Sequence, residues 1–407
     1  MFGRSLSRRR FLRDSALISL APAIPAFLRR TASGAETNTS GRILVVIQLG
    51  GGNDGINTVI PYADEGYAQH RRELRIKDDD LIKLNDQMAL HPSLRPMADL
   101  LDDGRLAIVQ GVGYPNPDRS HDVSMAIWQT ARFDPAEHKS YGWLGRATDE
   151  LAPPAAGAPH SILLGDSSPP VALRGRRSTS IALAHLHDLQ IAPGATLSNP
   201  SLADGADDLL AFARRTVVDA RTAAELIDDA VQASAANAAD YPQTELAGRL
   251  KSIAQLIKAD FATPVYYAIQ SGYDTHVAQL PAHGRLLREL AGATKAFLDD
   301  LQASGLSDRV LVMGFSEFGR RVEENGSLGT DHGTSGPVFL AGAGLQPGLH
   351  QTTPSMTDLE DGDLKMSVDF RSVYATILTN WLQTDPQPVV GGDFPLLDVL
   401  PALYANG

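Results

Sequence analysis

Apolar runs alternate along this chain with stretches of helical spacing. Five runs are nearly continuous in apolar residues, as expected of strands buried on both faces of a parallel sheet. They cover residues 42–49, 106–112, 265–269 and 310–315, and a fifth begins at 337–340. Helical periodicity occurs at residues 206–235, 243–257, 283–303 and 372–382. Strands that alternate with helices predict an α/β fold with helices on both faces of the sheet.

One stretch departs from this pattern. Residues 152–170 are rich in Pro, Ala, Gly and Ser, a composition typical of loops, and residues 151–245 carry weak strand signals. We interpret residues 151–245 as an insertion that covers one edge of the core.

The first 35 residues have the pattern of an export signal. Arg8, Arg9 and Arg10 precede an apolar run at 16–28. That run contains two prolines and is shorter than the roughly 20 residues of a membrane span. The twin arginines resemble a Tat signal, and small residues at 33–35 suit cleavage. We therefore expect the Tat translocon as an export partner, a periplasmic or secreted domain at 36–407 and no stable transmembrane anchor. The alternative is a basic arm or a membrane anchor.

Composition narrows the class further. The chain has 407 residues, of which 43% are hydrophobic and 21% charged, and this excludes disordered, collagen-like and coiled-coil proteins. It has no cysteine, which excludes disulfides, thiolate metal sites and a cysteine nucleophile. Removing residues 1–35 leaves 29 basic and 47 acidic residues, a net charge of −18. A strongly acidic domain argues against nucleic-acid binding, which needs a basic surface.

Chemically active residues follow four of the predicted strands. Ligands of open α/β sheets bind beyond the carboxyl ends of the strands, so these residues should share one edge. They are Asp54 after the first strand, Ser120 after the second, Asp274 and His276 after the third, and Glu317 after the fourth, with His332 in a following loop. Carboxylates and imidazoles are the ligands expected for Zn, Mn or Fe when no thiolate is present. We therefore predict one or two divalent metal ions at this edge, although Asp54 alone could merely cap a turn.

The glycines at 50–55 also fit the G-x-G-x-x-G pattern of dinucleotide-binding proteins. That motif needs a helix directly after it. Here the chain continues through β-branched residues to Pro61, which is poor helix material. A dinucleotide-binding oxidoreductase is therefore the less favoured interpretation.

Ser120 stands at the start of a segment with helical spacing. It could be an ordinary N-cap residue. It could also be a nucleophile, because a helix N-terminus holds anions and favours an ionised hydroxyl. Arg320 could clamp an anionic oxygen, or it could pair with Glu323 and Glu324 on a solvated face.

A set of motifs resembles one bacterial family. The motifs are GGGNDGINTVIPY, RSH followed by WQT, GYDTH, SEFGR, GTDHG and VDFRSVYATIL. Together with the twin arginines they are similar to the Tat-exported domain of unknown function family 1501. That family is similar in fold to the alkaline phosphatase superfamily, a three-layer α/β sandwich with a mostly parallel sheet, two metals and a Ser or Thr nucleophile.

The resemblance implies roles for single residues. Ser120 resembles the nucleophile. Asp274, His276 and His332 resemble the ligands of one metal, while Asp54 and Glu317 resemble those of the other. His121, Arg320 and Asp331 are expected to contact the substrate, a small anionic ester.

The sequence also departs from that superfamily. Phe318 stands where a histidine ligand is usual, and no cysteine is available for the sulfatase type of nucleophile. Two hypotheses follow. The first is a metal-dependent periplasmic hydrolase of phosphate or sulfate esters that uses a serine nucleophile. The second is a non-catalytic exported binding or assembly protein that retains the fold.

Overall fold

The computed structural model describes residues 41–152, 154, 158–165, 168–184, 186 and 239–401. The predicted signal at 1–35 and the predicted helix at 206–235 lie outside the described residues.

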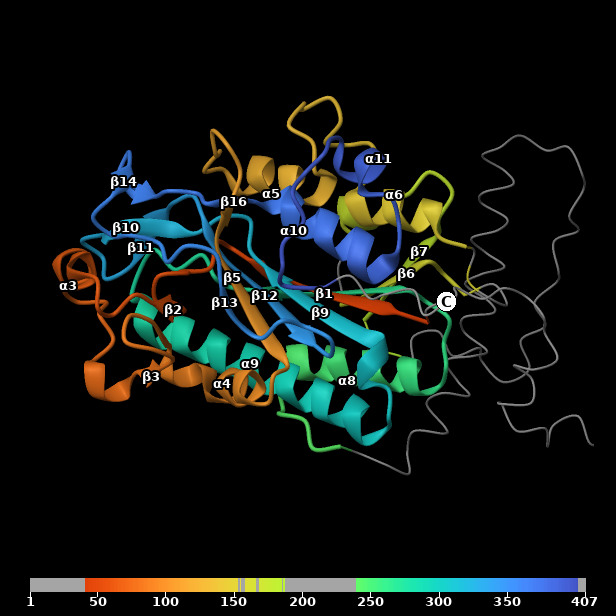
Figure 1. Cartoon of the computed structure of the whole chain (residues 1–407), viewed down its shortest axis with the longest axis horizontal. Helices are drawn as coiled ribbons and strands as arrows, with labels where there is room; N and C mark the ends of the chain where they lie inside the picture. Colours follow the sequence, from red (N-terminus) through yellow and green to blue (C-terminus); the bar gives the residue numbers. More distant parts are fainter. Residues whose placement is uncertain are drawn as a thin grey trace, which may run out of the picture.

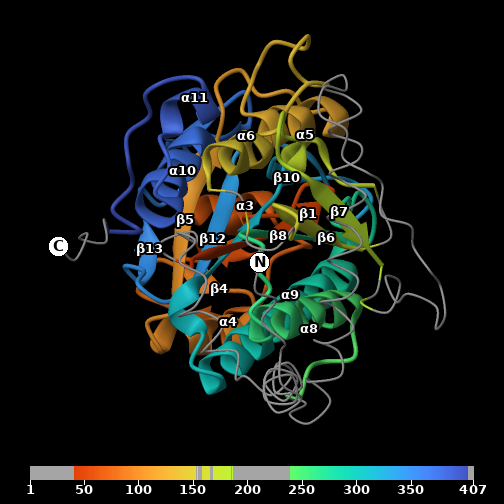
Figure 2. The same ribbon diagram turned by 90° about the vertical axis from the view of Figure 1, so that its right-hand side faces the viewer.

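A central sheet forms the middle layer of the protein (Figures 1 and 2). Within the described residues it has nine strands in the order β13-β5-β12-β9-β1-β8-β6-β7, with β16 also paired to β5. Neighbours are parallel except at β12, which runs antiparallel to both β5 and β9. The strands are β1 (Ile43–Gly50), β5 (Leu106–Gly113), β6 (Ser161–Leu164), β7 (Ser180–Leu183), β8 (Val265–Ser271), β9 (Val310–Phe315), β12 (Gly336–Gly342), β13 (Gly348–His350) and β16 (Val368–Asp369).

Helices cover both faces of the sheet, so the predicted three-layer α/β sandwich is confirmed (Figure 1). Ile43, Val45 and Ile47 of β1 pack against the first helical layer, and Leu44 and Val46 against the second. The first layer holds α4 (Arg95–Asp102), α8 (Glu245–Lys258) and α9 (Gln279–Ala303). The second holds α5 (His121–Thr130), α6 (Trp143–Glu150), α10 (Phe370–Thr376), the π-helix η8 (Ile377–Leu382) and α11 (Pro386–Val390).

Short elements complete the fold, and α3, β10, β11 and β14 gather at one end of the sheet (Figure 1). The short elements are α3 (Glu65–His70), β2 (Val59–Ile60), β3 (Ile82–Lys83), β4 (Ala89–Leu90), β10 (Arg320–Glu324), β11 (Thr330–His332), β14 (Leu359–Glu360) and β15 (Asp363–Leu364). The short 3-10 helices are η2 (Asp78–Asp80), η3 (Pro92–Leu94), η5 (Val171–Leu173) and η7 (Ser307–Arg309).

The five apolar runs are the strands β1, β5, β8, β9 and β12. After β1 the chain forms turns and then β2, so residues 51–58 lack the helix that a dinucleotide site needs. Residues 161–164 and 180–183, within the predicted insertion, extend the central sheet at its β8 side.

Candidate metal centre

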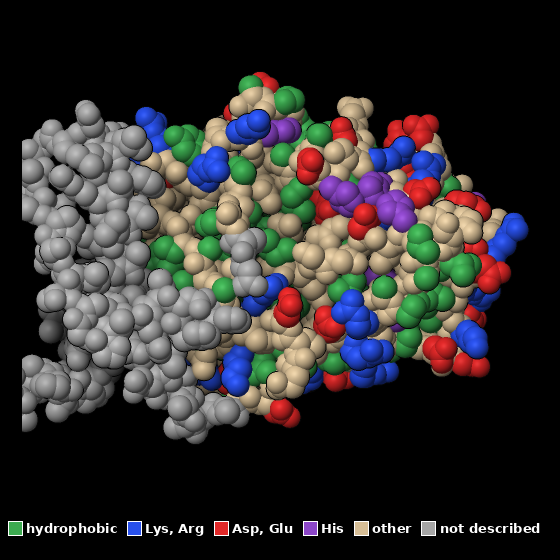
Figure 3. All heavy atoms as spheres, turned by 180° about the vertical axis from the view of Figure 1, so that it is seen from behind, with side chains coloured by type: hydrophobic (Ala, Val, Ile, Leu, Met, Phe, Trp, Pro, Cys, Tyr) green, Lys and Arg blue, Asp and Glu red, His purple; other side chains and the backbone are tan. Residues whose placement is uncertain are grey.

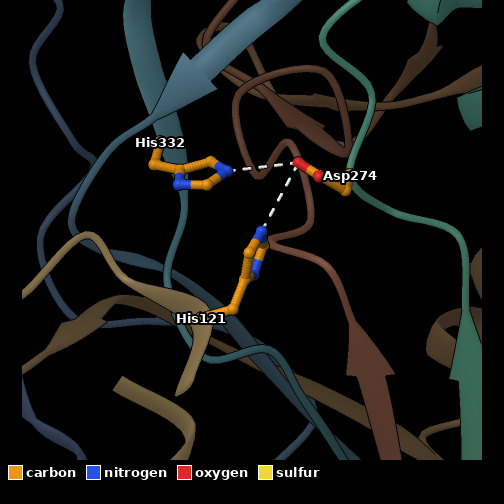
Figure 4. Close-up of side chains that lie close together, drawn as sticks. All are labelled: His121, Asp274 and His332. Carbon is orange, nitrogen blue, oxygen red and sulfur yellow. Dashed lines mark hydrogen bonds and ion pairs between the residues drawn. The ribbon is translucent and has the colours of Figure 1, made fainter. Parts of the chain in front are cut away.

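Separate segments of the chain bring polar side chains together beyond the ends of β8 and β9. Asp274 and His276 follow β8, His332 ends β11, and His121 is the first residue of α5. Figure 4 shows the rings of His121 and His332 turned toward Asp274. Histidine side chains also gather at one place on the surface seen in Figure 3. The structure therefore joins four of the residues selected from the sequence.

The three imidazole rings direct Nε2 at one carboxylate oxygen. Oδ1 of Asp274 lies 2.9 Å from His276 Nε2 and 3.1 Å from His332 Nε2. His121 Nε2 lies 3.5 Å from the same oxygen. The Nε2 atoms of His276 and His332 are 3.0 Å apart.

Each of these rings is held at its other nitrogen, Nδ1, by an oxygen acceptor. The acceptors are Arg119 O for His332 (2.7 Å), Asp331 Oδ1 for His276 (3.2 Å) and Glu317 Oε1 for His121 (2.9 Å). Carbonyl and ionised carboxylate oxygens only accept hydrogen bonds, so each Nδ1 carries the proton. Nε2 of each ring then carries a lone pair, as in histidines that bind metals, and Arg320 Nη1 lies 3.4 Å from Nε2 of His276.

These atoms fit a divalent metal ion. Two lone pairs only 3.0 Å apart repel each other unless a cation lies between them. A tetrahedral ion with bonds of about 2.0–2.1 Å would place its ligand atoms about 3.3 Å apart. The spacing within the cluster is close to that value, and the ligand atoms of His121, Asp274 and His332 all lie within 4.8 Å of one another. Imidazole and carboxylate ligands suit Zn, Mn or Fe.

The surroundings keep Asp274 ionised. Desolvation opposes its charge, but the hydrogen bond from Arg320 and the charge of Arg320 outweigh desolvation and lower the pKa of Asp274 to about 2. Asp331 is exposed and accepts from Asn325, and that bond together with one from His276 lowers its pKa. Asp331 thus supports His276 in the structure, and its contact with a substrate stays a prediction.

Arg320 is buried behind Asp274 and connects the loops of the centre. Its guanidinium donates to Asp274 Oδ1 (2.8 Å), Gly52 O (2.7 Å), Tyr273 O (2.9 Å), Thr330 O (2.8 Å) and Gly51 O. Because the N–H groups of Arg320 already have protein acceptors, they are not available to clamp a substrate oxygen. We therefore remove Arg320 from the predicted substrate contacts and assign it to positioning Asp274.

Glu317 is buried and supports His121. Besides His121 Nδ1, it accepts from the backbone N–H of Gly51 at 2.9 Å and from Ser316 Oγ at 3.0 Å. The neighbouring Phe318 packs on the rings of His121 and His332, with centroid distances of 5.0 and 4.8 Å. A protein hydrogen-bond network thus occupies the carboxylate expected to bind a second metal.

Asp54 lies in a separate buried ion pair with Arg71, and both side chains are 0% exposed. Arg71 donates from Nη1 to Asp54 Oδ2 at 2.6 Å and from Nη2 to Oδ1 at 3.1 Å. Gln279 donates to Oδ2 at 2.5 Å and the Asn57 N–H to Oδ1 at 3.3 Å. Both oxygens are therefore satisfied, and we do not assign Asp54 to the metal centre. Its capping of the turn at Asn57 agrees with the alternative prediction.

Ser120 occupies the N-cap position of α5, but its hydroxyl makes no capping hydrogen bond. Its backbone N–H donates to Asp118 Oδ1 at 2.7 Å. The residues on either side both belong to the centre, because the Arg119 carbonyl holds His332 and His121 points at Asp274. Ser120 is therefore an exposed residue that stands between two residues of the centre in the sequence, at the start of a ten-residue helix.

Comparison with known proteins places the chain in a family. Residues 42–394 match the family described as "Protein of unknown function (DUF1501)". The chain belongs to this family. The resemblance stated from the motifs is thereby confirmed at the family level. No curated protein matches this DUF1501 chain.

Several solved structures are similar to the DUF1501 chain. The PsFucS1 sulfatase from Pseudoalteromonas sp. has 11% identity and a TM-score of 0.41, with 88% of this chain and 72% of that one covered. The C-terminal periplasmic domain of EcEptC from Escherichia coli, in complex with Zn, has 9% identity and a TM-score of 0.36, with coverage of 74% and 73%. A protein in the alkaline phosphatase superfamily from Vibrio parahaemolyticus has 10% identity and a TM-score of 0.35, with coverage of 80% and 67%.

Two features of the DUF1501 site were not found from the sequence. The first is Arg71, which lies just after α3, far from any predicted strand end, so that no spacing marks it as the partner of Asp54. The second is the position of His121 beside Asp274, because the sequence pointed to it only as a substrate contact. Among the described helices, none has the length and apolar content that crossing a membrane requires.

Proposed function

We propose that this protein is a metal-dependent hydrolase of small phosphate or sulfate esters, with one divalent ion bound by His121, Asp274, His276 and His332. The observation that carries the proposal is the convergence of three imidazole Nε2 atoms on Asp274 Oδ1, each ring held at Nδ1 by an acceptor. Such fixed rings bind metals with little reorganisation. Zn, Mn and Fe are the candidate ions.

One ion is proposed in place of two because Asp54 and Glu317, the predicted ligands of the second metal, already have protein partners. Arg71 neutralises Asp54, and Glu317 is engaged by His121, Ser316 and the backbone of Gly51. Neither carboxylate has an oxygen without a protein partner.

Ser120 is the proposed nucleophile. Its hydroxyl would lose a proton as Oγ forms a bond to the phosphorus or sulfur atom, while the ester bond breaks and the departing alkoxide takes up a proton to leave as the alcohol. Water would later cleave the bond to Oγ, which releases the acid and restores the hydroxyl. The first N–H groups of α5 lack helical partners and would receive the anionic oxygens of the ester. A bound divalent ion would supply a Lewis acid that polarises the ester and favours an ionised hydroxyl.

The proposed place of action is outside the cytoplasm. The twin-arginine segment at residues 1–35 supports passage through the Tat translocon, and its small residues support cleavage there. A folded domain loaded with its metal before export would suit this route.

The test is hydrolysis of nitrophenyl phosphate, bis-nitrophenyl phosphate and nitrophenyl sulfate by protein loaded separately with Zn, Mn or Fe. We expect turnover of at least one ester, lost in Ser120→Ala with metal content unchanged. Ser140→Ala, which changes an exposed serine elsewhere, is the matched control and should keep wild-type rates. No turnover with any metal, or full turnover by Ser120→Ala, would contradict the proposal.

One observation favours the second hypothesis, a non-catalytic exported protein. Four protein ligands close a tetrahedral ion, as in structural metal sites, whereas catalysis needs a further position for the ester. A metal that stabilises the fold strongly but supports no turnover would favour this alternative.

A further inference from the structure

A cleft with a volume of 540 Å³ adjoins the candidate metal centre. One wall runs from Gly113, the last residue of β5, to Arg119, and the other is the hairpin of β14 and β15. Thr334 and Ser335 also line it. This volume is in the range of pockets that bind small organic molecules.

The cleft reaches Arg119, the residue next to the proposed nucleophile. Arg119 lines it and is followed directly by Ser120, while the carbonyl of Arg119 holds His332 at 2.7 Å. Thr334 lies two residues beyond His332. An ester whose phosphoryl or sulfuryl group sits at Ser120 therefore has room for its alcohol portion in this cleft.

The β14–β15 hairpin is fixed by its turn and by two arginines. Asp361 and Gly362 form the turn with φ of 52° and 80°, as expected of a two-residue Asp-Gly hairpin. Arg321 donates to the carbonyl of Asp361 at 2.7 Å, and Arg119 forms an ion pair with the buried carboxylate of Asp363. The wall is therefore a preformed surface.

The charges on that wall are unequal. The guanidinium groups of Arg119 and Arg321 both approach Asp363, Arg321 Nε at 3.9 Å. Lys365, which directly follows β15, forms an ion pair with Asp358, and neither residue lines the cleft. Glu360 and Asp361 line the cleft, and no ion pair of either carboxylate occurs within the described residues. Three carboxylates thus face two guanidinium groups, and the two carboxylates on the lining are the unneutralised ones.

We propose that this cleft binds the leaving alcohol of the ester and selects an alcohol that carries a positive charge over one that carries a negative charge. The inference rests on the proposed function and deepens it by naming the substrate class. Glu360 and Asp361 are the specificity-determining residues.

The test uses three esters that share a phosphate and differ in the charge of the alcohol: choline phosphate, glycerol phosphate and glycerate phosphate. Binding to metal-loaded Ser120→Ala is measured by titration calorimetry, and kcat/KM is measured with the wild type. One net charge about 6 Å away in a water-like medium predicts a difference of roughly tenfold between the positive and negative alcohols. The expected order is choline, then glycerol, then glycerate.

The variant Glu360→Gln/Asp361→Asn changes the net charge of the wall from −1 to +1, so it should reverse the preference to roughly tenfold in favour of the negative alcohol. Asparagine tolerates the positive φ of position 361, so the turn is kept. The matched control Asp79→Asn/Asp80→Asn removes the same charge from exposed residues outside the cleft lining and should leave the preference unchanged.

Equal affinity for the three esters, binding of none of them, or an unchanged preference in the double variant would overturn the inference. Ordered binding without any hydrolysis would support the cleft assignment and contradict the proposed hydrolase. The two proposals can therefore fail separately.

Discussion

The buried ion pair of Arg71 and Asp54 makes a quantitative prediction about stability. Replacing Arg71 with methionine keeps the length of the side chain but removes its charge and its donors. Asp54 would then be a fully buried carboxylate whose remaining partners are Gln279 and the Asn57 N–H. Two backbone carbonyls, of Arg321 and Val322, would also lose their donors, now at 2.9 and 2.7 Å.

The size of the loss follows from these contacts. Removing one partner of a buried ion pair costs about 3–5 kcal/mol, because the other charge stays buried without compensation. The free energy of unfolding of Arg71→Met should therefore fall by about 3–5 kcal/mol. Arg72→Met is the matched control, because Arg72 is the exposed neighbour and should change stability by at most about 0.5 kcal/mol.

The same pair predicts a pH dependence. Desolvation opposes the charge of Asp54, but the charge and hydrogen bonds of Arg71 outweigh desolvation and lower its pKa from 3.8 to about 2. A lowered carboxyl pKa contributes stability that is complete above pH 3.8 and is lost as the pH falls through about 2. The shift corresponds to roughly 2 kcal/mol. Asp54→Asn has no carboxyl to protonate and should not lose this stability. The difference in free energy of unfolding between wild type and Asp54→Asn should therefore shrink as the pH falls from 3.8 to about 2.

The assay is urea unfolding followed by fluorescence of the buried Trp128, Trp143 and Trp381. The double variant Asp54→Asn/Arg71→Met should be more stable than the sum of the two single changes predicts, because neither charge is then left alone. A loss in Arg71→Met no larger than in Arg72→Met, or strict additivity in the double variant, would refute the reasoning.

Two further changes test how the centre is supported. Glu317→Gln should weaken metal affinity about 10–100-fold without removing a ligand, measured by competition with a chelator, because the carboxylate that orients His121 is lost; unchanged affinity would show that Glu317 does not support the ring. Gly52→Ala should destabilise the protein, since φ is +76° there and a Cβ would lie 2.3 Å from the ring of Phe318. Thermal unfolding would show it, and Gly326→Ala, which has nothing within 4 Å, is the control.

The layers of this fold were predicted well from the sequence, because each central strand is a nearly continuous run of apolar residues. The run at 310–315 coincides with β9, and the runs at 42–49 and 106–112 differ from β1 and β5 by one residue at the ends. A strand buried on both faces leaves little room for polar residues, so its limits are visible. Helix α9 begins four residues before the predicted start, because Gln279, though polar, is buried against Asp54 and Thr330.

The site was only partly predictable. Strand ends indicated Asp274, His276 and His332, since parallel strands deliver their loops to one edge. The partners that decide each role are far away in sequence: Arg71 satisfies Asp54, and the carbonyl of Arg119 holds His332. Pairing of this kind depends on how loops pack after the sheet has formed, and no local pattern encodes it.

The most direct test of the account is the metal content of the purified protein, measured by elemental analysis beside Asp274→Ala and Asp54→Ala. The account predicts one equivalent of Zn, Mn or Fe per chain. This metal should be lost in Asp274→Ala and kept by the folded fraction of Asp54→Ala. Two equivalents in the wild type, with one lost on changing Asp54, would contradict the single-ion centre. A wild-type protein that binds no metal would contradict the centre altogether.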